Sequence, residues 1–240
     1  MTERCLAFVY ARSDSRRLPG KALMPLNGLP LIDLVCERAR RLRVDDCVLL
    51  TTDRPIDDEL AHHMKARGVS VFRGDAGDVV RRTVQAIHAL RPDWCLRVNG
   101  DCPLFEPVLA LSAFQQCDAD TEFISNIIHR RFPYGVAVEW FRAPMYCELA
   151  SEARDAEREH VTQHLYRLVD QIHTISFENE RDDSHLQLTI DTPADYARLA
   201  ALGASADLLS ASYWELFRLP PPKVVTTRVL RGRGMDERNK

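Results

Sequence analysis

The sequence lacks the features that define several common classes of protein. It has no Cys-x-x-Cys pair, and its seven cysteines, at positions 5, 36, 47, 95, 102, 117 and 147, are scattered and mostly lie in apolar runs. This pattern argues against a zinc site or a disulfide framework and favours buried thiols in a reducing compartment. The sequence also has no apolar signal core and no window suited to a membrane span. We therefore expect a cytoplasmic protein without a membrane partner.

The chain also has no basic excess. Its 32 Lys and Arg residues face 35 Asp and Glu residues, which gives a formal net charge of −3 over 240 residues. A protein that coats nucleic acid needs surplus positive charge to neutralise phosphates, so we expect no nucleic-acid partner. Local clusters of basic residues are then more informative than the total charge.

Short apolar runs alternate with segments of helical period through the first half of the chain. Strand-length runs lie at 5–10, 47–53, 69–72 and 94–98, and helical patterns lie at 30–39, 56–67 and 79–90. This alternation predicts an α/β fold, with a mostly parallel sheet, right-handed crossovers and helices on both faces.

The pattern becomes less regular beyond about Gln116. We expect strands at 121–126, 136–141, 173–177 and 186–190, and helices at 144–153, 157–168, from Pro193 onward and at 206–217. Thr192 is the expected cap of the helix that begins at Pro193. Without a clear linker, we assign 1–222 to one domain, with 121–182 as a subregion for acceptor binding or dimerisation. We expect 223–240 to be a basic tail, either mobile or an arm of an oligomer.

The most distinctive stretch runs from Ala11 to Lys21, between the first strand and the first helix. It holds four cations in ten residues, and Pro19-Gly20 supplies a tight turn. A basic loop with a glycine at the carboxyl end of the first strand can offer N–H donors and positive charge to phosphates. The stretch therefore predicts a polyphosphate-binding loop, although it matches neither the Gly-x-x-x-x-Gly-Lys-Ser/Thr loop nor the Gly-x-Gly-x-x-Gly pattern.

Two aspartates follow predicted strands and are candidate Mg2+ ligands. Asp101 follows the strand at 94–98, and Asp191 lies between the strand at 186–190 and the next helix. Mg2+ favours one or two carboxylates, with water and phosphate oxygens completing its shell. The alternatives are that Asp101 only forms a turn and that Asp191 only caps a helix. Together with the basic loop, the two carboxylates suit the transfer of a nucleotidyl group.

The segment from Glu157 to His164 allows several interpretations. His160 and His164 would lie four residues apart on one helix face and could bind a metal, but no third ligand has a suitable spacing. We favour Arg158 and His160 as lining an acceptor pocket, with the arginine holding an acidic group. The alternative is a solvated helix face with salt bridges.

Four motifs together resemble the cytidylyltransferase family, which includes the acylneuraminate and 3-deoxy-manno-octulosonate enzymes. They are Ala-Arg-x-x-Ser-x-Arg-Leu-Pro-Gly-Lys at 11–21, Asn-Gly-Asp-Cys-Pro-Leu at 99–104, Glu-Arg-Glu-His-Val-Thr at 157–162 and Ile-Asp-Thr-Pro-x-Asp at 190–195. The likeness covers roughly residues 5 to 200 and is greatest to the spore-coat polysaccharide biosynthesis F-type branch. It implies a Rossmann-like nucleotide-diphospho-sugar transferase fold.

The resemblance also implies roles for individual residues. Catalytic roles fall to Arg12, Lys21 and Asp101, and Mg2+ binding falls to Asp101 and Asp191. The implied nucleotide-binding residues are Ala11, Arg12, Ser15, Lys21, Arg73, Gly74, Asp78, Asn99 and Gly100. Among them, Arg73, Gly74 and Asp78 fall where the family's base and ribose contacts lie. The expected acceptor-binding residues are Arg130, Tyr134, Glu157, Arg158 and His160.

The expected reaction is Mg2+-dependent transfer of CMP from CTP to an acidic sugar or a phosphate- or phosphonate-bearing acceptor, with release of pyrophosphate. The alternatives are another nucleoside triphosphate, a glycosyltransferase of the same fold, or a non-catalytic nucleotide-binding scaffold. We also expect a homodimer. One departure from the family pattern is Asp14, a carboxylate where the family often has a small residue; it is expected to pair with Arg16 or Arg17 or to assist a metal.

Overall fold

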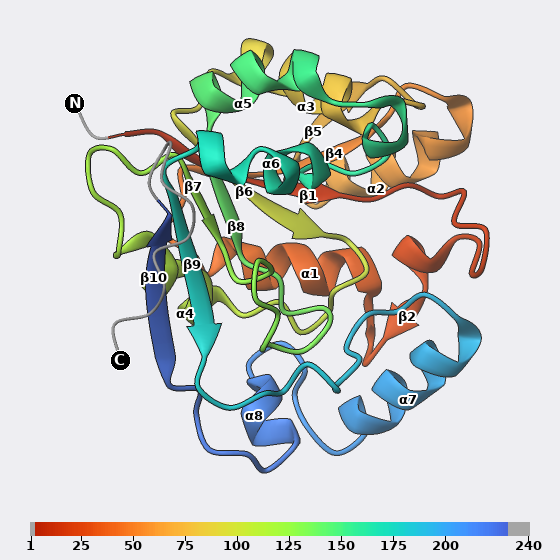
Figure 1. The fold of residues 1–240 in the computed structure, drawn as a ribbon. Coiled ribbons are helices and arrows are strands. Elements are labelled where there is room, and N and C mark those ends of the chain that lie inside the picture. The colour runs from red at the N-terminus through yellow and green to blue at the C-terminus, as the bar shows by residue number, and fades with distance from the viewer. Residues whose placement is uncertain (1–2, 230–240) are drawn as a thin grey trace.

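The computed structural model describes residues 3–229 and has an eight-stranded mixed sheet at its centre (Figure 1). The strands of this sheet are β1 (Cys5–Tyr10), β4 (Asp46–Thr52), β5 (Ser70–Gly74), β6 (Trp94–Asn99), β7 (Phe123–Ser125), β8 (Glu139–Arg142), β9 (Thr174–Asn179) and β10 (Val224–Val229). The short strands β2 (Pro25–Leu26) and β3 (Leu29–Pro30) form a separate hairpin. The helices are α1 (Leu31–Arg40), α2 (Asp58–Ala66), α3 (Val79–Leu90), α4 (Pro107–Phe114), α5 (Ala143–Leu149), α6 (Gln163–Arg167), α7 (Pro193–Gly203) and α8 (Tyr213–Leu216).

The strand order places the ends of the first four long strands along one edge. The sheet runs β10-β9-β7-β8-β6-β1-β4-β5. Strands β6, β1, β4 and β5 are mutually parallel, whereas β8 is antiparallel to both β6 and β7. The carboxyl ends of β1, β4, β5 and β6 therefore open onto one shared edge, where α/β folds bind ligands. The predicted mostly parallel α/β sheet is confirmed.

Two hydrophobic cores lie on the two faces of the sheet. Alternate residues of β1 enter opposite cores, so that Ala7 and Val9 face one core and Leu6 and Phe8 face the other. Helices α1, α2 and α4 pack into the first core, and α3, α5 and α6 pack into the second. Figure 1 shows α1 and α3 on opposite sides of the strands. Helices on both faces were predicted, but α4 was not.

A buried arginine explains why the expected helix at 206–217 shrinks to α8. Arg38 of α1 is 2% exposed and donates hydrogen bonds to the carbonyl oxygens of Phe105 and Leu208, at 2.7 and 2.8 Å. It also donates to the carbonyls of Leu209 and Ala211. Carbonyl groups that satisfy a buried guanidinium are drawn out of a helical arrangement, so this part of the chain stays irregular. The prediction of a long last helix was wrong.

Tertiary contacts also shorten the helix expected at 157–168 to α6. The carbonyl of Arg158 accepts from the N–H of Val79 at 2.7 Å, and the Thr162 hydroxyl bonds to the buried carboxylate of Glu139. These contacts hold 158–162 as a turn ahead of the helix. His160 and His164 therefore do not share a helix face as the sequence suggested.

The strand expected at 186–190 is an extended segment outside the sheet. Its one β-bridge joins Gln187 to Tyr134, and the N–H of Ile190 donates to the carbonyl of Asp101 at 2.9 Å. Gly135 lies so close that an added Cβ would be 2.8 Å from the carbonyl carbon of Leu188. The segment is thus fixed by loops rather than by a neighbouring strand.

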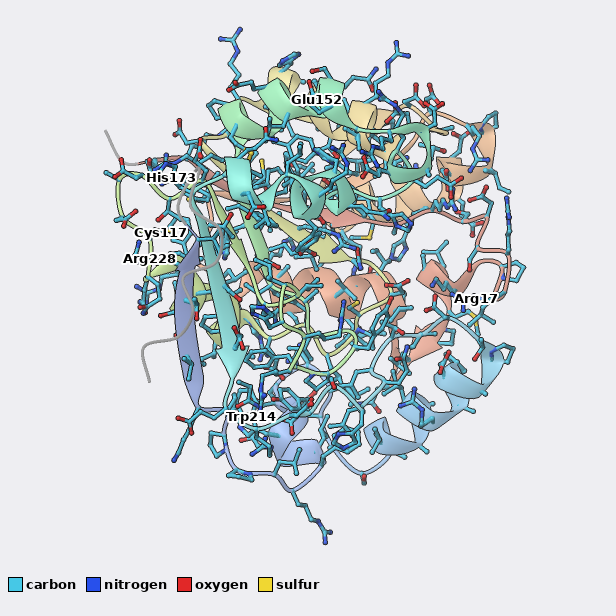
Figure 2. The ribbon with its side chains drawn as sticks, in the orientation of Figure 1. Arg17, Cys117, Glu152, His173, Trp214 and Arg228 are labelled. Carbon is cyan, nitrogen blue, oxygen red and sulfur yellow. The ribbon has the colours of Figure 1, made fainter. Side chains whose placement is uncertain are left out.

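The sheet extends further along the chain than the predicted boundary at residue 222. Val224–Val229 forms β10, antiparallel to β9, so this segment is part of the sheet and not a mobile tail; its role as an oligomer arm stays a prediction. Figure 2 places Arg228 beside Cys117, and Arg228 forms an ion pair with Asp118 in the same turn. The rest of the expected tail, 230–240, lies outside the described residues. None of the helices described for 3–229 combines the length and apolar character that a bilayer-spanning segment requires.

Candidate functional site

A cleft of about 520 Å³ opens at the carboxyl edge of the parallel strands. It is lined by Tyr10, Ala11, Arg12, Ser15, Arg16, Arg17, Lys21, Ala22, Ala76, Gly77, Val79, Arg82, Arg97, Asn99, Gly100, Asp101, Glu159, His160, Val161 and Asp191. Lysine and arginine outnumber carboxylates among these residues by two to one, although the chain as a whole is slightly acidic. The cleft is therefore a local basic site suited to a polyanion.

The basic loop after β1 is folded onto itself and onto the neighbouring strand end. The N–H of Gly20 donates to the carbonyl of Ser13 at 3.0 Å, and the N–H of Ser13 donates to the Asp57 carboxylate at 2.7 Å. Gly20 has φ +70°, which favours glycine. This turn leads into a 3₁₀ turn that begins at Lys21 and directs its side chain into the cleft.

We had expected Asp14 to pair with Arg16 or Arg17, but its carboxylate contacts other arginines. Its carboxylate lies 2.6 Å from Arg54 and 3.3 Å from Arg12. Burial alone would raise the pKa of Asp14, but the hydrogen bond from Arg54 and the charge of Arg12 bring this pKa below its ordinary value. The acidic residue thus anchors the loop to Arg54, two residues beyond the end of β4.

Lys21 joins the two aspartates that the sequence singled out. Its Nζ lies 2.8 Å from Asp101 Oδ2 and 3.1 Å from Asp191 Oδ1, and it also donates to the carbonyl of Ile190 at 2.8 Å. Burial alone would lower the pKa of Lys21, but the two carboxylates raise it above its ordinary value. Carboxylates that are 90 residues apart in the chain therefore meet around one positive charge at the edge of the sheet.

Asp191 also forms an ion pair with the loop. Arg17 lies 3.0 Å from Asp191 Oδ1, and Figure 2 labels Arg17 on the side where the loop after β1 approaches α7. Thr192 caps α7 by accepting from the N–H of Asp195, while Pro193 begins the helix, as predicted. The capped start of α7 therefore holds Asp191, which directly precedes Thr192, in place.

Asn99 and Gly100 bring β6 close to the basic loop at 11–21. The N–H of Gly100 donates to the carbonyl of Tyr10 at 2.8 Å. An added Cβ on Gly100 would lie 2.7 Å from the Cβ of Ala11 and 2.9 Å from that carbonyl oxygen. Only glycine permits this approach, so the first and fourth parallel strands end side by side at the cleft.

Two arginines on the floor of the cleft were not found from the sequence. Arg82 comes from α3, and Arg97 comes from β6, where it forms an ion pair with the fully buried Glu139. Arg97 could have been recognised in the sequence as a charged residue within the otherwise apolar run Trp94–Val98. Its partner is 42 residues away, a distance that no local pattern reveals.

The three residues expected at the base and ribose are placed differently from one another. Arg73 is turned away from the cleft: it donates to the carbonyls of Thr52 and Arg54, at 2.9 and 2.8 Å. Gly74 ends β5 against the side chains of α3, while the Asp78 side chain caps α3. None of these three residues lines the cleft, but their neighbours Ala76, Gly77 and Val79 do.

The expected acceptor residues divide into three groups. His160 lines the cleft, and Arg158 forms an ion pair with Asp78 at 2.8 Å just beside it. Glu157 instead pairs with Arg167, and the hydrogen bond from Arg167 lowers the pKa of Glu157 to about 2. Arg130 stacks over the exposed ring of Tyr134 at 4.7 Å, and neither residue lines the cleft.

The residues present suit a magnesium ion that is shared with a phosphate ligand. Within 3–229, no group of three or more His, Cys, Asp or Glu residues forms a self-sufficient metal cage. Asp101 and Asp191 are partly exposed to the cleft and already hold one cation, the Lys21 ammonium. Two carboxylates plus phosphate oxygens and water form a typical Mg2+ shell.

The fold and the cleft define an α/β protein with a basic ligand site at the carboxyl edge of its parallel strands. The cytidylyltransferase family model matches residues 6–215, and the chain belongs to this family. It is 32% identical over 212 residues to the spore coat polysaccharide biosynthesis protein SpsF of Bacillus subtilis, covering 82% of this chain and 85% of the relative.

Solved structures agree with this assignment. A cytidylyltransferase from Leptospira borgpetersenii is 32% identical, with a TM-score of 0.84 over 90% of this chain and 93% of that chain. A CMP:2-keto-3-deoxy-manno-octonic acid synthetase, solved in complex with CTP, shares the fold at 20% identity, with a TM-score of 0.64 over 84% of this chain and 98% of that chain. A Mycobacterium tuberculosis protein in complex with manganese also shares the fold, at 20% identity and a TM-score of 0.56, over 83% of this chain and 99% of that chain. The expected family and fold are confirmed.

Proposed function

We propose that the protein transfers CMP from CTP to an acceptor that carries an acidic group, such as an acidic sugar or a phosphate- or phosphonate-bearing alcohol, and releases pyrophosphate. Membership of the cytidylyltransferase family supports nucleotidyl transfer. The observation that carries the proposal is the contact of Lys21 with both Asp101 and Asp191, in a cleft that three further cations of the same loop also line. A homodimeric assembly and a cytoplasmic location remain predictions.

In this proposal, the loop holds the triphosphate. Arg12 and Lys21 are placed to neutralise the charge that grows on the leaving pyrophosphate, and the Ser15 hydroxyl and the loop N–H groups offer hydrogen bonds. Asn99 and Gly100 hold the nucleotide beside β6. Catalysis of phosphoryl-type transfer consists mainly of such positioning and charge neutralisation.

The chemical step is an in-line displacement at the α-phosphorus of CTP. An acceptor oxygen forms a bond to this phosphorus while the bond to the bridging oxygen of the β-phosphate breaks, so pyrophosphate leaves and the acceptor proton is lost to solvent. Asp101 and Asp191 would hold Mg2+, which supplies charge neutralisation at the phosphate oxygens and lowers the pKa of the attacking hydroxyl. We assign no general base.

The test is a pyrophosphate-release assay with Mg2+ and each of the four nucleoside triphosphates. The acceptor panel contains acidic sugars and phosphorylated or phosphonate alcohols, and mass spectrometry identifies the product. The expected result is a CMP adduct formed only with CTP. Release with another triphosphate would replace the nucleotide in this proposal, and CTP binding without turnover on any acceptor would favour a non-catalytic scaffold.

A further inference from the structure

Arg82 is a buried cation that lacks an anionic partner. The residue is 4% exposed, and although the charges of Asp57 and Asp75 act on it, it forms no ion pair with a carboxylate of residues 3–229. Its one side-chain hydrogen bond runs from Nη1 to the carbonyl of Asp75 at 3.0 Å, and its Nε is buried without a partner. Burying an unpaired charge is strongly unfavourable, so such a group indicates a missing ligand of opposite charge.

The free part of this guanidinium faces the cleft. Arg82 lines the cleft, and Nη2 is neither hydrogen-bonded to a described residue nor among the fully buried atoms without a partner. Burial lowers the pKa of Arg82, because a poorly solvated site disfavours its charge. An anion bound at Nη2 would relieve this penalty with a charge-assisted hydrogen bond.

Arg97 places a second guanidinium on the same floor. Tyr10, Arg82 and Arg97 all line the cleft, and the charges of both arginines act on the Tyr10 phenol. One Arg97 nitrogen is held by Glu139, which is fully buried, while Nε has no partner. Burial alone would lower the pKa of Arg97, but Glu139 raises it, so this arginine stays charged.

Arg97 is linked to the part of the cleft that Glu159, His160 and Val161 line. The carboxylate of Glu139 accepts hydrogen bonds from the hydroxyl groups of Thr162 and Tyr166, the latter at 2.7 Å. Thr162 directly follows the cleft-lining residues Glu159, His160 and Val161. The guanidinium of Arg97 and this part of the cleft are therefore held by one buried network, separate from the loop at 11–21.

We propose that Arg82 and Arg97 form a second anion-binding subsite, which takes the carboxylate or phosphate group of the acceptor and selects acidic acceptors. This inference rests on the proposed function. The four loop cations are assigned to the triphosphate, so the floor cations remain for the second substrate. Arg82 is the specificity-determining residue, because Arg97 is already neutralised in part by Glu139.

The experiment isolates this subsite by first filling the phosphate loop. The protein is saturated with Mg2+ and α,β-methylene-CTP, which cannot release pyrophosphate. Calorimetry then measures the binding of 3-deoxy-manno-octulosonate, inorganic phosphate and neutral mannose. Wild type is compared with Arg82→Gln and with Arg81→Gln, a control on the same helix whose side chain is exposed and does not line the cleft.

We expect the wild type to bind at least one of the two anions and not mannose. Arg82→Gln should weaken this binding by about tenfold or more, the scale of one charge-assisted hydrogen bond, with unchanged affinity for the CTP analogue. Arg81→Gln should match the wild type. If Arg82→Gln does not fold, Arg82→Met, which keeps the apolar stem, replaces it.

Three results would overturn the subsite: a loaded wild type that binds neither anion, an Arg82 variant that binds the anion as tightly as wild type, or a loss confined to the CTP analogue. Failure of the proposed function looks different. A wild type that does not bind the CTP analogue at all would remove the basis of both proposals, whereas normal analogue binding with unchanged anion affinity in Arg82→Gln contradicts only this one.

Discussion

The ammonium group of Lys21 lies between Asp101 and Asp191, where a divalent cation would also be attracted. The two carboxylates are 27% and 22% exposed, so solvent reaches them, while the Lys21 side chain is 13% exposed. In the absence of nucleotide, the lysine balances charges that would otherwise repel each other. In the proposed reaction, the oxygens of a bound triphosphate would compete for the same ammonium.

Replacing this lysine should expose the two carboxylates to metal. In Lys21→Met, we expect Mg2+ without nucleotide to raise the thermal unfolding temperature by about 2–4 °C, the shift for about 1 kcal/mol in a chain of this size. The wild type should respond much less, because its own ammonium occupies the site. Thermal unfolding with and without Mg2+ checks this, with Arg16→Met as the control for lost loop charge. An equal response in the three proteins would mean that Lys21 does not shield the carboxylates.

Gly100 is a residue at which a single methyl group should damage the site. The Cβ of Gly100→Ala would lie 2.7 Å from that of Ala11, so β6 and the loop must separate, at a cost of about 1–3 kcal/mol. Both the stability and the affinity for CTP should fall. Denaturant unfolding and calorimetry measure these two quantities.

Gly77 provides the matched control, since it lines the same cleft but an added Cβ meets nothing closer than 3.9 Å. Gly77→Ala should leave stability within about 0.5 kcal/mol of the wild type, as for an ordinary surface substitution. Equal effects of the two changes would argue against close packing at Gly100.

At the level of secondary-structure elements, residues of the candidate site lie at strand ends and next to helix starts. The start of α7 illustrates this, because Thr192 and Asp195 form a reciprocal capping box directly after Asp191. Thr192→Ala should cost about 1 kcal/mol of stability and loosen Asp191, which lowers the affinity for CTP in the presence of Mg2+. Thr192→Ser keeps the hydroxyl and should restore both. Calorimetry and denaturant unfolding of the pair distinguish the cap from a general packing effect.

The sequence predicted those elements whose local pattern and tertiary environment agree. The four parallel strands and α1, α2 and α3 have strong periods and were found close to their observed bounds. The errors at 157–168, 186–190 and 206–217 arose where distant groups compete for the backbone. Arg38 and Val79 donate hydrogen bonds to carbonyl groups that would otherwise bond within a helix. No pattern among neighbouring residues in the sequence indicates these distant contacts.

The candidate site, like the fold, was predictable from the sequence only in part. The loop at 11–21 and the two aspartates follow strand ends, so the rule for parallel sheets brings them together. Whether Arg73 or Arg82 reaches the cleft depends on side-chain direction. Arg73 turns to the carbonyls of Thr52 and Arg54, while Arg82, on the buried side of α3, reaches the floor.

For the whole molecule, a buried histidine should make stability fall in mild acid. His164 is fully buried, neither ring nitrogen has a hydrogen-bond partner among the described residues, and burial lowers its pKa from 6.5 to about 4. Between these values the unfolded chain binds more protons than the native protein, so stability decreases as the pH falls from about 6.5 to about 4. The full effect is on the order of 3 kcal/mol.

His164→Phe should remove most of this pH dependence, because phenylalanine does not titrate and can keep the edge contact with Tyr146. Unfolding free energies measured from pH 7 to pH 4 check this, with the exposed His88→Phe as the control. An acid slope as steep as that of the wild type would show that groups other than His164 cause the loss.

The central claim is that Asp101 and Asp191 hold a divalent cation against a nucleotide on the basic loop. The most direct measurement is calorimetric titration of CTP, with and without Mg2+, into the wild type, Asp101→Asn and Asp53→Asn. Asp53 follows β4 at the same edge but is exposed and does not line the cleft. We expect Mg2+ to strengthen CTP binding about tenfold or more in the wild type and Asp53→Asn, but not in Asp101→Asn. The same Mg2+-dependent binding in Asp101→Asn would contradict the account.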